Sequence, residues 1–231
     1  MAPPPRPEPP LPSAGSASGD GPVNIFPLRI RFAKLGKARF FSHHDLLRAL
    51  ERAIRRAGLP IRMSEGFNPH PRLSMPVALG LGVESHDEIL EIELGSWVPP
   101  RETQRLLAEQ MPEGLEIRSV EPFSRKDRTQ VSTVEYEAVL EAPPPTLADA
   151  VRDLLASREA VVRRTSDKRS KLVDVRSYLR ALVLDGNLLR MTLQVTDQGA
   201  AKPEEVLELL GVESREGTRI AKTRTELTRR A

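Results

Sequence analysis

The stretch ARFFSHHDLLRALERAIRRAGLP, residues 38–60, decides the fold because it contains the clearest helix in the chain. Ser42 and Asp45 have the S-x-x-D spacing of a capping box, which marks a helix start. Gly58 ends the pattern, as glycines after a helix commonly do. Between them, apolar side chains recur at helical spacing at Leu46, Leu47, Leu50, Ala53, Ile54 and Ala57. The sequence therefore predicts an amphipathic helix over 43–57, with one apolar face and one polar face.

Strand and helix patterns continue on either side of this helix. Before it, PLRIRFAKLG (27–36) alternates apolar and charged residues, which is typical of a half-buried strand. After it come two short extended pieces on either side of a turn-rich stretch, at 60–64 and 72–82, and then a strand, a helix and a strand, at 88–97, 100–111 and 114–123. The order β-α-β-β-α-β is the signature of a ferredoxin-like sandwich.

The same order repeats in the second half of the chain. Strand patterns occupy 133–142, 160–179, 187–197 and 218–227, and helix patterns occupy 146–157 and 202–211, with Thr146 expected to cap the first helix. The linker is predicted at 124–130. We therefore expect an α+β protein with two tandem ferredoxin-like units, at 23–124 and 125–231.

Composition limits what the chain can do. Residues 1–22 hold eight prolines and almost no large apolar side chain, so we expect a disordered Pro-rich tail. The chain has no cysteine, which excludes disulfides, thiolate catalysis and iron–sulfur ligation, and fits a reducing cytoplasm. No run of apolar residues approaches the roughly 18 residues that a membrane span requires. We expect no cofactor and no metal site.

Charge is distributed unevenly along the first half. Residues 24–72 hold eleven Arg and Lys against three Asp and Glu, whereas 73–124 hold three against ten. Planar arginine side chains suit phosphate oxygens, so we expect a nucleic-acid-binding surface formed by Arg48, Arg52, Arg55, Arg56 and Arg72. The alternatives are a solvated helix face, or pairing of the helix with the acidic residues 84–93.

The stretch SEGFNPHPR (64–72) is stiff because each residue before a proline is pushed toward an extended backbone. A stiff loop suits contact with unstacked bases, the usual way in which single-stranded RNA is read. We expect Asn68 and His70 near base edges and Phe67 in a stacking role. The alternatives are a purely structural crossover and a Phe67 that plugs the core.

Two histidines raise the possibility of catalysis. His43 lies at the predicted helix start, where the positive end of the dipole favours a neutral imidazole. With His70 and a carboxylate such as Asp45, it forms a candidate acid–base pair for RNA cleavage. No catalytic motif accompanies these residues, and the sequence favours a protein that is not an enzyme.

Several strings in the chain resemble a bacterial family of unknown function that is called radical-SAM-linked or radical-SAM-associated. They are Ser42–Leu46, Arg56–Pro60, Gly66–Pro71 and Gly82–Ser85, with KLVDVRSYL and RTEL further on. The resemblance covers roughly residues 26–227. It implies that the chain is the stand-alone form of a domain found fused to or beside B12-binding radical-SAM proteins. A separate radical-SAM protein is then the expected partner.

Three functions remain open from the sequence. The leading one is an accessory protein that binds or presents RNA to the radical-SAM partner. The second is a protein-interaction module that docks this partner without nucleic acid. The third is a metal-independent endoribonuclease, because the expected architecture is similar to that of CRISPR repeat-RNA processing enzymes.

Overall fold

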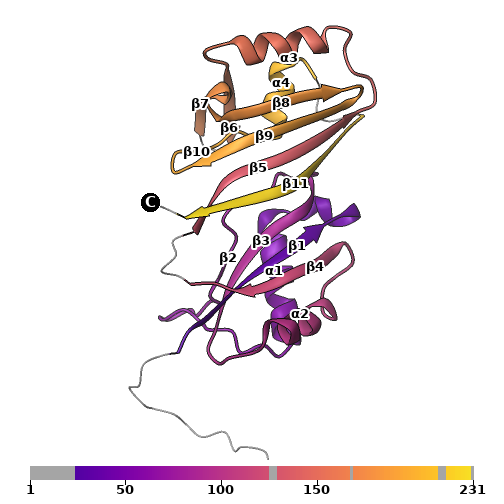
Figure 1. Cartoon of the computed structure of the whole chain (residues 1–231). Coiled ribbons are helices and arrows are strands. Elements are labelled where there is room, and N and C mark those ends of the chain that lie inside the picture. Colours follow the sequence, from indigo (N-terminus) through magenta and orange to yellow (C-terminus); the bar gives the residue numbers. More distant parts are fainter. Residues whose placement is uncertain (1–23, 125–128, 167–168, 213–216, 230–231) are drawn as a thin grey trace, which may run out of the picture.

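The computed structural model describes residues 24–124, 129–166, 169–212 and 217–229, so the expected N-terminal tail lies outside the described residues. Within these ranges the chain forms a nine-stranded sheet and a separate two-stranded sheet. Helices pack against the large sheet (Figure 1). The predicted α+β class is confirmed.

The first half of the chain, in the lower part of Figure 1, supplies four strands to the large sheet. Its elements are β1 (Phe26–Lys34), a 3₁₀ turn (Gly36–Phe40), α1 (His43–Arg56), β2 (Leu73–Ser74), β3 (Glu84–Leu94), α2 (Pro100–Ala108) and β4 (Leu115–Pro122). The strands lie in the order β2-β3-β1-β4, and all these neighbours are antiparallel.

Helix α1 forms where the sequence predicts it. The Ser42 side chain accepts a hydrogen bond from the Asp45 backbone N–H, so it satisfies one of the free donors at the helix start. Leu46, Leu50 and Ile54 are buried on one face of the helix. They join a core with alternate residues of β1 and β3 and with Leu107 of α2, so both helices cover the same face of the first half.

The second half, in the upper part of Figure 1, follows a similar course with an added hairpin. Its elements are β5 (Thr129–Leu140), α3 (Leu147–Ala156), β6 (Val161–Ser166), β7 (Arg169–Asp174), a 3₁₀ turn (Val175–Tyr178), β8 (Leu179–Asp185), β9 (Leu188–Thr196), β10 (Gly199–Ala200), α4 (Pro203–Leu209) and β11 (Thr218–Arg229). Strands β6 and β7 form the small sheet. In the large sheet β9 lies beside β5, and β5 lies beside β11.

Two details of the second half differ from the sequence expectations. Thr146 precedes α3 but its side chain makes no capping hydrogen bond, so the predicted cap is wrong. Its backbone has φ −86° and ψ 0°, outside the extended region that a capping residue adopts. Strand β8 was not predicted, although it pairs with β9 over most of its length.

The two halves meet along a seam between β3 and β11. These strands are parallel, with Ala221 opposite Glu84 and Lys222 opposite Ser85. Each half has its own apolar core, but Val83 of the first half is buried in the core of the second. The segment before β3 therefore crosses the seam. Within the described part of the chain, no helix is both long and apolar enough to span a membrane.

Candidate functional site

The stretch 64–72 forms the closed end of a hairpin. Met63 and Pro71 face each other as a β-bridge, and the Arg72 N–H donates to the Arg62 carbonyl at 2.7 Å. Ser64 and His70 close the loop, because the Ser64 N–H donates to the His70 carbonyl at 2.7 Å and the His70 N–H donates to Ser64 Oγ at 2.9 Å. The stiffness expected from the two prolines is thus reinforced by hydrogen bonds.

The tip of this hairpin projects Phe67 into solvent. The side chain is 108% exposed relative to its reference, so the alternative in which Phe67 plugs the core is wrong. Asn68, His70 and Arg72 are exposed as well. We call Phe67, Asn68, His70 and Arg72 the tip residues.

The polar face of α1 carries three arginines that no described residue pairs with. Arg48, Arg52 and Arg55, the helix arginines below, are exposed and have no ion pair within the described ranges. Arg56 differs, because its guanidinium donates to the side-chain and backbone oxygens of Gln110 at 3.2 and 2.5 Å. Arg56 therefore ties α1 to the end of α2.

The acidic residues 84–93 pair with arginines outside α1 rather than with the helix arginines. Four pairs form, with N–O distances of 2.8, 2.6, 3.3 and 3.6 Å: Arg29–Glu91, Arg31–Asp87, Arg62–Glu93 and Arg39–Glu84. Much of the basic region 24–72 is therefore neutralised within the first half. The uncompensated positive charge concentrates on the polar face of α1.

His43 and His70 lie at opposite ends of the first half. His43 starts α1 just after β1, whose last residue Lys34 pairs with Ser85 at the beginning of β3. The hairpin that carries His70 pairs through Ile61 with Leu94, the last residue of β3. From Ser85 to Leu94 an extended strand spans about 30 Å at roughly 3.3 Å per residue. The structure does not bring the two imidazoles together.

Asp45, the third member of that candidate acid–base set, is engaged locally. Ser42 Oγ and Asp45 Oδ2 are 2.6 Å apart. The hydrogen bond from Ser42 lowers the pKa of the Asp45 carboxyl. Asp45 therefore serves as part of the helix cap in this structure.

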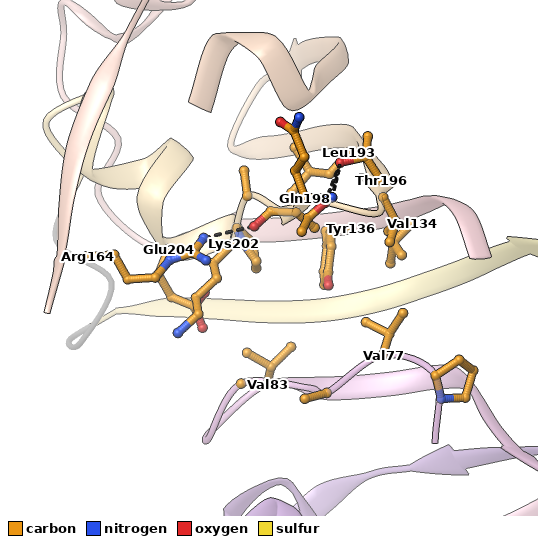
Figure 2. A pocket seen from close by; sticks show the side chains of 18 of the residues that line it. Val77, Val83, Val134, Tyr136, Arg164, Leu193, Thr196, Gln198, Lys202 and Glu204 are labelled. Atoms are coloured by element: carbon orange, nitrogen blue, oxygen red, sulfur yellow. Dashed lines mark hydrogen bonds between the residues drawn. The ribbon is translucent and has the colours of Figure 1, made fainter. Parts of the chain in front are cut away.

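A cavity that the sequence did not indicate lies at the seam between the halves. This seam pocket has a volume of about 390 Å³ (Figure 2). Segment 76–83 forms one wall, and β5, the β9–β10 turn and the start of α4 form the others. The labelled side chains Val77 and Val83 lie across the cavity from Val134 and Leu193 (Figure 2).

Polar groups gather at one end of the seam pocket. Arg164 of β6 binds Glu205 in a fork, with N–O distances of 2.5 and 2.7 Å, and donates to the Ala200 carbonyl at 2.8 Å. Glu204, the neighbour of Glu205, is not part of this pair. Burial raises the pKa of the Glu204 carboxyl, and its Oε2 is shielded from solvent with no hydrogen-bond partner in the described residues.

A row of buried polar side chains crosses the large sheet and ends at Tyr136, which lines the seam pocket. Lys34, Ser85, Lys222 and Tyr136 are successive cross-strand partners on β1, β3, β11 and β5, and all are buried. Lys222 Nζ lies 2.5 Å from Glu88 Oε1. Burial lowers the pKa of Lys34, and burial also raises the pKa of Tyr136, with further contributions from Glu88 and Glu204.

The seam pocket left no recognisable signal in the sequence. Its lining comes from separated segments of both halves, and the family string Gly82–Ser85, which supplies Val83, does not by itself indicate a pocket. Lys34 and Lys222 read as ordinary surface lysines. The only usable hint was Tyr136, a polar aromatic residue in a strand that otherwise alternates apolar and charged residues.

Together these features define a two-core α+β protein with an exposed arginine helix, a projecting hairpin and a pocket at its seam. A family model described as "Uncharacterized protein conserved in bacteria (DUF2344)" matches residues 27–203. The chain belongs to this bacterial family, whose function is not characterised. No curated protein matches the chain.

Two solved structures show weak similarity. One belongs to a Cbf5–Nop10–Gar1 complex, with 12% identity and a TM-score of 0.40 over 84% of this chain and 48% of the other. The chain thus spans about half the length of that protein. The second is an unknown protein from Galdieria sulphuraria, with 16% identity and a TM-score of 0.28 over 90% of this chain and 100% of the other. Both TM-scores are low, so neither similarity bears on the function.

Proposed function

We propose that the protein binds single-stranded RNA through the helix arginines and the tip residues, as an accessory to a separate radical-SAM protein in the cytoplasm. The observation that carries this proposal is Phe67. A large apolar ring held in solvent on a closed hairpin gains nothing for the fold, but it offers a stacking platform to an unstacked base.

The positions of the charged groups support the same proposal. The helix arginines stand one or two helical turns apart on the polar face of α1, and 84–93 leaves them uncompensated. The chain passes from the end of α1 to the hairpin within a few residues, where the Gly95 N–H binds the Pro60 carbonyl. A strand held by its phosphates along α1 would then meet the hairpin beyond the helix end.

The wider architecture of the chain supports the same role. Each half has the strand order of a ferredoxin-like sandwich, with the β6–β7 hairpin inserted into the second, and we interpret them as two such units divided near 124 and 125. The partner follows from the family resemblance in the sequence. The absence of cysteine from the chain leaves cluster chemistry to that partner.

The test is binding of fluorescent single-stranded RNA, measured by anisotropy over a range of salt concentrations. The variant Arg52→Glu with Arg55→Glu is expected to weaken binding at least about tenfold and to flatten the salt dependence. Its control is Arg101→Glu with Arg158→Glu, which makes the same charge change at exposed sites on α2 and after α3. Equal losses in both double variants would contradict the proposal.

Phe67→Ala separates stacking from charge. It is expected to weaken RNA binding by roughly 1–3 kcal/mol while leaving the salt dependence unchanged, because stacking releases no counterions. An unchanged affinity would remove Phe67 from the interface.

A second candidate is a module that docks a protein partner. Met63 lies on the same hairpin as Phe67 and is 44% exposed, so the hairpin offers apolar contact area suited to a protein surface. Co-purification of the radical-SAM partner that resists nuclease treatment and is lost with Phe67→Ala would favour docking. An endoribonuclease has no comparable support, because His43 and His70 lie far apart.

A further inference from the structure

The seam pocket has the form of a small-ligand site. Its volume of about 390 Å³ lies in the range of small-molecule pockets, and valine and leucine side chains form facing walls (Figure 2). Such walls suit the two faces of a flat, uncharged ring. Selectivity must come from the few polar groups that reach the cavity.

Glu204 is the first of these groups. The Glu204 carboxylate packs against Gly80. A Cβ added at Gly80 would lie 2.7 Å from Glu204 Oε1, so any larger residue at position 80 would displace the carboxylate. Its Oε2 is buried and unpartnered among the described residues. A buried acceptor without a donor is costly, and a ligand that supplies N–H groups relieves this cost.

Tyr136 is the second polar group. Its ring is buried in β5, and Figure 2 shows the hydroxyl directed into the space between the two halves. None of the hydrogen bonds found among the described residues involves this hydroxyl. It is therefore available to donate to a carbonyl oxygen of a ligand.

We propose that the seam pocket binds a guanine base, with its N1–H and amino group donating to Glu204 and its O6 accepting from the Tyr136 hydroxyl. A carboxylate offers only acceptors, so it matches the two adjacent donors of the guanine edge. Adenine and cytosine place a ring-nitrogen acceptor beside their amino group, and this acceptor would face the carboxylate. Hypoxanthine keeps N1–H but lacks the amino group.

The remaining charges shape the opening. Arg164 is held by Glu205 and the Ala200 carbonyl and is not free for the ligand. Lys202 is exposed at the rim and suits a phosphate attached to the base's sugar. The guanine can belong to a free nucleoside or to a strand held by the helix arginines. Only the second source depends on the function proposed above.

The first experiment titrates the full chain with guanosine, inosine and adenosine, followed by amide chemical shifts. We expect guanosine to bind about tenfold tighter than inosine, and adenosine to bind more weakly still. The shifted amides should belong to 76–83, β5 and the start of α4. Equal binding of the three nucleosides, no binding, or shifts confined to other regions would overturn the proposal.

Two variants assign the polar contacts. Glu204→Gln replaces one acceptor with a donor and should cost about tenfold or more in guanosine affinity, whereas Glu208→Gln, at an exposed position on the same helix, should cost nothing. Tyr136→Phe removes only the hydroxyl and should cost a few-fold. Equal affinities of Glu204→Gln and Glu208→Gln would overturn the assignment even if guanosine binds.

A final arm identifies the source of the base. A short RNA with one guanine is compared with the same RNA carrying adenine, in wild type and in Arg52→Glu with Arg55→Glu. A preference for the guanine RNA that requires both Glu204 and the helix arginines makes the base part of a strand. Guanosine binding that survives the arginine changes while RNA binding is absent supports the pocket alone and removes the RNA proposal.

Discussion

Lys222 of β11 and Glu88 of β3 form an ion pair with an N–O distance of 2.5 Å, and each side chain is only 1% exposed. Lys34 of β1 is buried close enough to feel the charge of Glu88, and its Nζ donates to the Phe41 carbonyl at 3.2 Å. Buried charges are tolerated only when they are paired. The seam between the halves therefore depends on this cluster.

Replacing Lys222 should reduce the free energy of unfolding far more than replacing Lys34. Lys222→Met breaks the ion pair and is expected to reduce the free energy of unfolding by about 3 kcal/mol, because it breaks a buried pair. Lys34→Met, the matched control, removes a lysine that has no ion pair in the described part of the chain and whose Nζ donates to the Phe41 carbonyl at 3.2 Å. It is expected to cost only about 1 kcal/mol, because one hydrogen bond is lost and no ion pair is broken. Urea denaturation of both variants gives the comparison, and equal losses would show that the lysines share the carboxylate evenly.

The depressed pKa of Lys34 gives a pH dependence with a defined sign. The unfolded chain keeps this lysine protonated up to its ordinary pKa of 10.5, whereas burial lets the folded protein lose the proton earlier. The unfolded state then binds more protons, so stability rises as the pH climbs through the folded pKa toward 10.5. The neighbouring charges are Glu88 on β3 and Lys222 on β11.

The measurement compares wild type with Lys34→Met by denaturation at neutral and alkaline pH. The difference in stability between them should shift in favour of wild type as the pH rises, since the variant lacks this proton. A constant difference across the pH range would mean that Lys34 does not titrate in this window.

The caps of α1 and α3 provide a matched pair of substitutions. Ser42→Ala removes a capping hydrogen bond and should cost about 1 kcal/mol. Thr146→Ala removes no such bond and should be close to neutral. Thermal or chemical denaturation measures both, and a loss at Thr146 equal to that at Ser42 would contradict the capping geometry.

Gly114 should be the less replaceable of two glycines with positive φ. Gly114 has φ +85°, and an added Cβ would lie 2.5 Å from the Leu35 carbonyl oxygen, a backbone atom that already accepts a hydrogen bond from the Ala38 N–H. Gly186 has φ +61° with open space around it. We expect Gly114→Ala to cost roughly 3 kcal/mol or more and Gly186→Ala about 1 kcal/mol, measured by denaturation.

Phe67→Ser tests the exposure of the hairpin tip. A side chain that buries no surface contributes no packing, so the melting temperature should stay within about a degree of wild type. The matched substitution Phe32→Ser, at a fully buried position of β1, should unfold the chain or cost several kcal/mol. A clear loss of stability in Phe67→Ser would show that the ring packs on the protein in solution.

The sequence predicted those elements whose signals are local. α1 was predictable because Ser42 marks its start and its apolar residues keep helical spacing. β3 begins at Glu84 rather than at the predicted first residue, Glu88, because the polar residues before it, Asp87 among them, show no strand alternation. Arg31 and Lys222 neutralise these two carboxylates across the sheet, and no local pattern shows partners so distant in the chain.

The candidate sites also divide into those that local sequence signals indicate and those that depend on distant residues. The polar face of α1 and the exposed hairpin were predictable, because both lie within continuous stretches of sequence. The separation of His43 from His70 was not, since it depends on which end of β3 each one adjoins. The seam pocket was equally hidden, because Val83, Tyr136 and Glu204 meet only after both halves have folded.

The parallel pairing of β11 with β3 also has a consequence for synthesis on the ribosome. β3 leaves the ribosome before β11, so during translation the part of its edge that β2 does not cover lacks a neighbour, and Glu88 lacks Lys222. Open strand edges of this kind attract other chains while a protein is unfinished. Co-translational chaperone capture of the nascent first half should therefore end only when residues 218–229 emerge.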